Sequence, residues 1–145
     1  MIFIAKEAKG LPDLSDIFSN IGRSHKKLLN PFLQVSLGSS SLIKTDVKLN
    51  ELYPVWNEEI SIPVCHYAHI LKVEVKDWEH NGNETVGWVD ISIEELLRGE
   101  EIRGPNDDGW HGVVIKEKGS KQILEGKVCF FIKFIPATDD KSGEL

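Results

Sequence analysis

The chain has 145 residues, a length that suits one domain with a hydrophobic core of its own. Its 17 Lys and Arg residues against 23 Asp and Glu residues give a net charge of −6, which argues against non-specific binding to nucleic acid, because such binding requires a basic surface. The acidic total does not exclude binding to an anionic membrane, since a local basic patch acts independently of the net charge.

Eight short segments have the composition of β-strands, and the clearest is residues 71–77, where Leu71, Val73 and Val75 alternate with charged residues. In chain order the segments are residues 2–5, 32–37, 42–45, 59–64, 71–77, 85–91, 110–114 and 127–135. Clusters of Gly, Pro, Asn and Asp separate them. This pattern predicts an all-β fold, an eight-stranded antiparallel β-sandwich.

One or two short helices are expected in the loops. Residues 92–99 begin with Ser92 in the N-cap position, continue with acidic residues and end at Gly99. Residues 17–29 fit either a second helix or a mobile loop. We therefore expect one sandwich domain at residues 1–136, followed by a flexible tail at residues 137–145.

Several features of the sequence limit the classes of function that we expect. Cys65 and Cys129 do not have the spacing of a zinc site, and reduced thiols of a cytoplasmic protein are the simplest interpretation. No apolar run approaches the ~20 residues that span a bilayer. Motifs of a catalytic nucleophile, a phosphate-binding loop or a zinc protease are missing from the sequence, so we expect a protein that is not an enzyme.

Several motifs in a fixed order resemble the C2 domain family. They are Ala8-Lys9-Gly10-Leu11-Pro12, Asn30-Pro31-Phe32-Leu33-Gln34-Val35, Lys44-Thr45 with Tyr53-Pro54-Val55-Trp56-Asn57-Glu58-Glu59, and Asp77-Trp78-Glu79 with Val86-Gly87. The strand order resembles the second of the family's two permuted topologies, as in phospholipases and novel protein kinases C. Residues 65–69 and 94–101 are further similar to the C2 domain of plant-type phospholipase D, although that enzyme's HxKxxxxD motif is missing here.

The resemblance implies a calcium site built from acidic residues on two loops. The corresponding residues here are Asp16, Asn30, Asp77, Glu79 and Glu84. Asn30 contributes no charge. Glu79 and Glu84 occupy positions where the family uses aspartate, and glutamate is longer by one methylene. We expect either a weak calcium site, which requires six to eight oxygen ligands, or a solvated acidic surface without metal.

Two groups of residues are candidates for lipid binding. The segment of residues 17–29 places Ile17 and Phe18 beside the cations Arg23, Lys26 and Lys27, which suits an interfacial segment. The alternative is a helix whose apolar side packs on the sandwich. The resemblance also implies a smaller basic patch at Lys44 and Lys48, although these lysines equally fit a solvated sheet surface.

The sequence thus leaves two functions open. The first is a membrane-targeting module that binds anionic phospholipid, with weak or no calcium dependence, in a cytoplasmic protein peripheral to the membrane. The second is a calcium-independent scaffold for protein–protein interaction. Neither uses nucleic acid as a partner.

Overall fold

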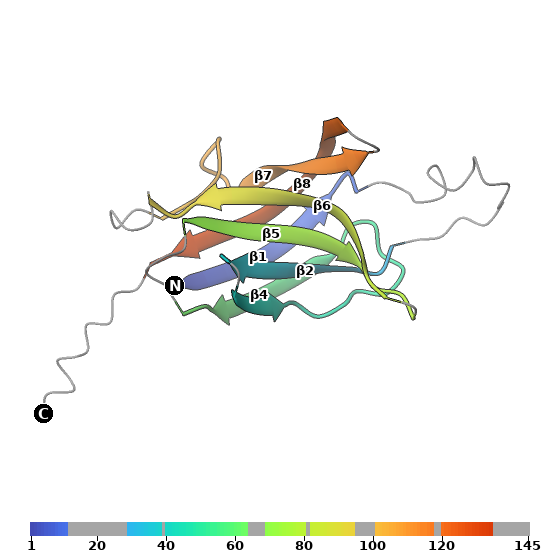
Figure 1. The fold of residues 1–145 in the computed structure, drawn as a ribbon, viewed down its shortest axis with the longest axis horizontal. Helices are drawn as coiled ribbons and strands as arrows, with labels where there is room; N and C mark the ends of the chain where they lie inside the picture. The colour runs from blue at the N-terminus through green and yellow to red at the C-terminus, as the bar shows by residue number, and fades with distance from the viewer. Residues whose placement is uncertain are drawn as a thin grey trace, which may run out of the picture.

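A computed structural model describes residues 1–11, 29–38, 40–63, 69–80, 82–94, 101–117 and 120–134. Within these ranges the chain forms eight β-strands that pair antiparallel (Figure 1). They are β1 (Ile2–Lys9), β2 (Pro31–Leu37), β3 (Ser40–Lys44), β4 (Val55–Ser61), β5 (Ile70–Asp77), β6 (Glu84–Ser92), β7 (Trp110–Glu117) and β8 (Ser120–Lys133).

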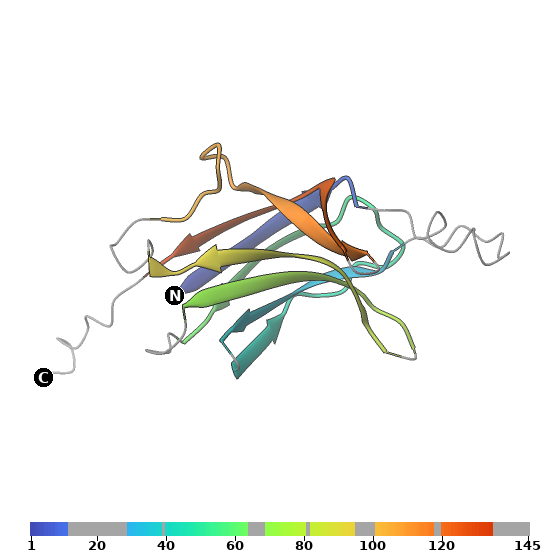
Figure 2. The same cartoon turned by 45° about the horizontal axis from the view of Figure 1, so that its top comes forward.

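The strands are arranged in two layers, which Figures 1 and 2 show from two sides. The strand order is β3-β2-β5-β6-β7-β8-β1-β4. Among the described residues the β6–β7 ladder holds one pair, Trp88 with Val114, whereas β5 and β6 pair from one end of β5 to the other. The strands β3-β2-β5-β6 and β7-β8-β1-β4 therefore act as two sheets that meet at one corner. The predicted eight-stranded antiparallel sandwich is confirmed.

The core lies between the two layers and follows the predicted alternation. Leu71, Val73 and Val75 of β5 are fully buried, while Lys72 between them is exposed. Side chains at the inward positions of the other strands complete the core, because alternate residues of a strand point to the same face of its sheet.

Three rings form a stack in this core. Phe3 of β1 lies with its ring centroid 5.0 Å from that of Phe130 of β8. His111 of β7 covers Phe130 from the other side, at 3.8 Å and with the ring planes 6° apart. All three residues are buried. The stack joins three strands of one sheet through side chains as well as through the backbone ladder.

Cys129 is a buried, free cysteine, and Cys65 lies outside the described residues. Burial raises the pKa of the Cys129 thiol, and the carboxylates of Glu7 and Asp108 act in the same direction. A thiol with a raised pKa remains protonated at neutral pH and reacts slowly, which fits the expectation of a reduced cysteine.

All eight strands differ from their predicted bounds by one residue or more, and β4 and β8 differ the most. The strand predicted at residues 59–64 runs from Val55 to Ser61, because Val55 already pairs with Glu7 of β1. The strand predicted at residues 127–135 begins at Ser120 and forms a hairpin with β7. Its first half contains Lys121, Gln122 and Glu125. Such a polar stretch does not show the apolar alternation on which the prediction depended.

The predicted helices lie mostly outside the described residues. At the start of the segment 92–99, the backbone N–H of Glu94 is 3.5 Å from the hydroxyl oxygen of Ser92, the contact that an N-cap would make. The rest of this segment, the segment 17–29 up to residue 28, and the tail at 137–145 are outside the described residues. In the part of the chain that is described, no helix is long and apolar enough to cross a membrane.

The buried imidazole of His111 makes stability depend on pH. Burial lowers the pKa of His111 from its ordinary value of 6.5, whereas a backbone hydrogen bond with Phe130 and the Asp108 carboxylate act in the opposite direction. The unfolded chain therefore binds more protons than the folded chain once the pH falls below the unfolded pKa. We expect His111 to reduce the free energy of unfolding by up to about 1.4 kcal/mol per pH unit, from about pH 6.5 down to its folded pKa.

Urea unfolding at several values between pH 7.5 and pH 5 would measure this effect, with His111→Phe as the control variant. Phenylalanine preserves a ring on Phe130 and cannot titrate. The variant should lose less stability than the wild type as the pH falls. An equal loss in the two proteins would show that His111 does not carry the effect.

Candidate functional site

Several residues that the sequence singled out lie at one end of the sandwich. Pro31, the first residue of β2, pairs with Asp77, the last residue of β5, and Asp77 pairs in turn with Glu84, the first residue of β6. The connection between β3 and β4 reaches the same place, since the N–H of Lys48 donates to the carbonyl of Pro31 at 3.0 Å. We call residues 29–31, 46–54 and 77–80 the loop end; it lies at the right of Figure 1.

Asn30 joins three segments of the loop end. Its side-chain Nδ2 donates to the carbonyl of Trp78 at 3.1 Å, and its Oδ1 accepts the N–H of Asn50 at 2.8 Å. Its backbone N–H donates to Oδ1 of Asp77 at 2.8 Å, and its carbonyl accepts the N–H of Trp78 at 2.9 Å. The side chain and backbone of one residue thus hold together the start of β2, the loop before β4 and the loop after β5.

The predicted calcium positions differ in their burial and in their contacts. Asp77 is fully buried, whereas Glu84 is exposed although it pairs with Asp77 in the ladder. Glu79 is half-buried, and the Oδ1 atom of Asn30 already accepts a hydrogen bond. Among the described residues no three His, Cys, Asp or Glu side chains come together to hold a metal ion. Asp16, the remaining position, lies outside them.

The loop of residues 46–54 is anchored at its base by the motif that carries much of the family resemblance. The indole N–H of Trp56 donates to the carbonyl of Asp46 at 3.0 Å, and the N–H of Asp46 donates to Oε2 of Glu58 at 2.9 Å. The hydroxyl of Thr45 accepts the N–H of Leu33 at 2.9 Å. Lys-Thr and Trp-Asn-Glu are therefore structural motifs here: they fix the loop to the sheet.

Two large apolar side chains project from this anchored loop. Leu49 is 66% exposed and Tyr53 is 67% exposed. Val55, where β4 begins, is 50% exposed. Because Asn50 is tied to Asn30, Leu49 is presented beside the start of β2 rather than on a free loop. A rigid loop with exposed apolar residues at its tip is suited to bind a partner, because little conformational freedom is lost on binding.

The sequence interpretation missed Leu49 and Tyr53. Leu49 belongs to no alternating segment and to no family motif, and Tyr53 entered only as the first residue of the motif at residues 53–59. The available signal was an isolated leucine between Lys48 and Asn50, in a stretch rich in turn-forming and charged residues. That signal is weak, because the sequence alone does not show whether a leucine in a turn is buried or exposed.

The predicted lipid-binding lysines lie at different places. Lys48 is half-buried at the loop end, directly before Leu49. Lys44 is exposed on β3, where it pairs with Gln34 of β2. The structure thus places one of the two beside the exposed leucine and the other on the sheet. The further candidates Ile17, Phe18, Arg23, Lys26 and Lys27 lie outside the described residues.

The fold and the loop end define a β-sandwich domain with its candidate site on loops at one end of the scaffold. The family model of the C2 domain matches residues 3–108, and the chain belongs to that family.

Relatives and solved structures agree with this membership. Phospholipase D delta of Arabidopsis thaliana is 28% identical over 79% of this chain, which spans only 13% of that protein's length. The ADP-ribosylation factor GTPase-activating protein AGD12, also of Arabidopsis thaliana, is 30% identical over 80% of this chain and 37% of its own length. A C2 domain-containing protein from a putative elicitor-responsive gene has a TM-score of 0.65 at 21% identity, covering 94% of this chain and 88% of the other.

A calcium-bound structure of two C2 domains of extended synaptotagmin 2 has a TM-score of 0.63 at 16% identity. It covers 90% of this chain and 43% of the other. At these identities the structural likeness concerns the fold alone.

Proposed function

We propose that this domain docks on membranes that contain anionic phospholipid, that its loop end makes the contact, and that calcium dependence is weak or absent. The observation that carries the proposal is the exposure of Leu49 and Tyr53 on an anchored loop, next to Lys48. Leucine at the tip suits insertion among acyl chains, and tyrosine suits the boundary between acyl chains and headgroups. Membership of the C2 family and relatives named phospholipases D support a phospholipid surface as the target.

The expected affinity is modest. Burial of a leucine side chain in the membrane contributes about 1.5–3 kcal/mol. A lysine near an anionic leaflet adds about 1 kcal/mol, which applies to Lys48 beside Leu49. Ile17, Phe18, Arg23, Lys26 and Lys27 remain sequence candidates for lipid binding outside the described residues. Binding of this size suits a peripheral, cytoplasmic module that acts together with a second membrane contact.

Weak or absent calcium dependence is supported by the role of Asn30. Where calcium-binding relatives are expected to have an aspartate, this side chain forms hydrogen bonds to two neighbouring loops. Asn30 therefore fixes the loop end without an ion. A weak calcium response would involve Asp16, Asn30, Asp77, Glu79 and Glu84.

Co-sedimentation with vesicles tests the proposal. The domain is mixed with vesicles of phosphatidylcholine alone or with added phosphatidylserine, each with calcium and with a chelator. We expect binding to the phosphatidylserine vesicles in chelator, and we expect added salt to weaken it because the lysine contribution is screened. Binding only with calcium would contradict the weak calcium dependence. No binding in either condition would overturn the membrane proposal and favour the protein-interaction scaffold.

A further inference from the structure

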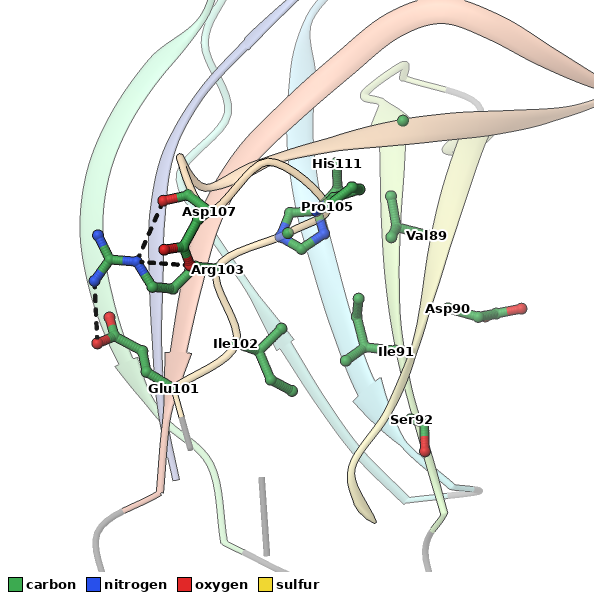
Figure 3. Close-up of a pocket in the computed structure, with 12 residues that line it drawn as sticks. Val89, Asp90, Ile91, Ser92, Glu101, Ile102, Arg103, Pro105, Asp107 and His111 are labelled. Atoms are coloured by element: carbon green, nitrogen blue, oxygen red, sulfur yellow. Dashed lines mark hydrogen bonds and ion pairs between the residues drawn. The ribbon is translucent and has the colours of Figure 1, made fainter. Parts of the chain in front are cut away.

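A cavity of about 500 Å³ lies away from the loop end (Figure 3). One wall is the second half of β6, residues 89–92, and the other is the segment of residues 101–107 that precedes β7. Ser92 pairs with Ile70, which places this half of β6 toward the end of the sandwich opposite the loop end. The cavity opens where β6 and β7 separate beyond their pair of Trp88 and Val114.

Polar and apolar atoms line the cavity in nearly equal measure, and its apolar side chains include Val89, Ile91 and Ile102. Figure 3 shows Val89 and Ile91 of β6 pointing toward Ile102 on the opposite wall, while Asp90 between them points away. Val89 and Ile102 are buried members of the core, so a molecule in the cavity would contact the edge of the hydrophobic core directly. A volume of this size is in the ordinary range for small-molecule sites.

Among the polar side chains that line the cavity, His111 is the buried one. Its side chain is buried, with 4% of the residue exposed, and it lines the cavity. Among the described residues, no hydrogen-bond partner reaches its Nε2 atom. A buried polar atom without a partner costs free energy, which a ligand that supplied the partner would recover.

The chemistry of His111 specifies that partner. Burial holds the ring in its neutral form by lowering its pKa, and a hydrogen bond to the backbone of Phe130 engages the ring. That bond raises the pKa, as expected when a ring N–H donates to a carbonyl oxygen. A neutral imidazole has one N–H. Because Nε2 is the ring nitrogen without a partner, we place the N–H on Nδ1, so that Nε2 carries the lone pair and accepts a hydrogen bond. The matching ligand group is a hydroxyl or an N–H.

The rim of the cavity selects against anions. Arg103 is engaged by Glu101, with 3.5 Å between Nη1 and Oε2, and by Asp107, with 3.5 Å between Nε and Oδ1. One arginine therefore faces two carboxylates, and the balance at the rim is negative. Gly104 brings the rim backbone close to the ring: a Cβ atom there would lie 2.6 Å from the carbonyl oxygen of Trp110 and 3.3 Å from Cε1 of His111.

From this geometry we propose that the cavity is a binding site for an uncharged small molecule with an apolar body and one hydroxyl or N–H donor, which hydrogen-bonds to Nε2 of His111. The side chains of Val89, Ile91 and Ile102 bind the body of the ligand, and His111 selects for the donor. The site is separate from the loop end and does not depend on membrane docking.

A pair of probes of the same shape tests the proposal. Indole has an apolar bicycle and one N–H, whereas indene replaces that N–H by CH₂. The domain is titrated with each probe and followed by NMR of the backbone amides and of the His111 ring nitrogens. We expect saturable shifts at residues 89–92 and 101–107 with both probes, about tenfold tighter binding of indole, and a shift of the Nε2 resonance with indole alone.

Two variants complete the test. His111→Phe preserves the ring stack and removes the acceptor, so it should bind indole and indene equally. Ile91→Phe reduces the cavity without changing His111, so it should weaken both probes. Equal affinity of the wild type for the two probes would overturn the role of His111. Saturable shifts confined to other parts of the wild-type domain, or no saturable shift, would overturn the site itself. These results are obtained with the wild type and do not depend on whether a variant folds.

Discussion

Replacement of Leu49 by aspartate should weaken binding to phosphatidylserine vesicles about tenfold to a hundredfold, because the variant loses the burial of a leucine side chain, worth about 1.5–3 kcal/mol. The new carboxylate also faces an anionic surface, so the true loss should lie at the upper end of this range. Leu49 is 66% exposed, and its side chain contributes little to folding. The free energy of unfolding should therefore change by no more than about 0.5 kcal/mol. Vesicle sedimentation and urea unfolding measure the two quantities.

Ile70→Asp is the matched control for this prediction. Ile70 is 51% exposed, and it begins β5 at the end of the sandwich opposite the loop end. The variant removes an exposed apolar side chain and adds the same charge at a different place. It should bind vesicles as the wild type does. If both variants lost binding to the same degree, net charge rather than the loop end would account for the effect.

Replacement of Asn30 by alanine should lower the free energy of unfolding by about 1–3 kcal/mol, because it removes two hydrogen bonds and leaves partly buried groups without their partners. The bonds are those from Nδ2 to the carbonyl of Trp78 and from the N–H of Asn50 to Oδ1. Vesicle binding should also weaken, since the loop that carries Leu49 loses its tie to β2 and must be ordered on the membrane.

Two further variants separate the parts of this effect. Asn30→Asp preserves an acceptor for Asn50 and loses the donor to Trp78, so its stability should fall between those of the wild type and Asn30→Ala. Asn106→Ala changes an exposed asparagine in the turn before β7 and should be neutral. A change below about 0.5 kcal/mol in Asn30→Ala would show that the loops are held by other contacts.

The layers of the sandwich could be predicted because burial and alternation coincide in its strands. Residues 71–77 are the clearest example, since the period of two in the sequence becomes the buried face of β5. The first half of β8 could not be predicted in this way. Residues 120–126 pair with β7 in a hairpin, and the polar side chains among them give no periodic signal.

The candidate site was harder to predict than the fold, because its geometry depends on contacts between distant residues. The exposure of Leu49 follows from hydrogen bonds that Asn30 makes to residues 20 and 48 positions further along the chain. The family resemblance pointed to the loop end through Asn30 and Asp77. It described Asn30 as a weakened calcium position, whereas its contacts in the structure hold loops together. The five calcium positions remain a prediction.

His111 illustrates the same limit. The sequence places it in a predicted strand, where a histidine has no distinctive meaning. The binding role proposed for His111 depends on three features that only the fold supplies. They are the ring of Phe130 stacked on it, the backbone of Gly104 beside it, and the cavity between β6 and residues 101–107. Each of these comes from a different part of the chain.

The most direct test of membrane docking places an environment-sensitive fluorophore on a cysteine at position 49 or at position 70, in a background where Cys65 is replaced by serine and Cys129 stays buried. Each labelled protein is mixed with phosphatidylserine vesicles in chelator. We expect the emission of the fluorophore at position 49 to shift to shorter wavelength, as in an apolar environment, and the emission at position 70 to remain unchanged. A shift at position 70 alone, equal shifts at both positions, or no shift at either would contradict docking through the loop end.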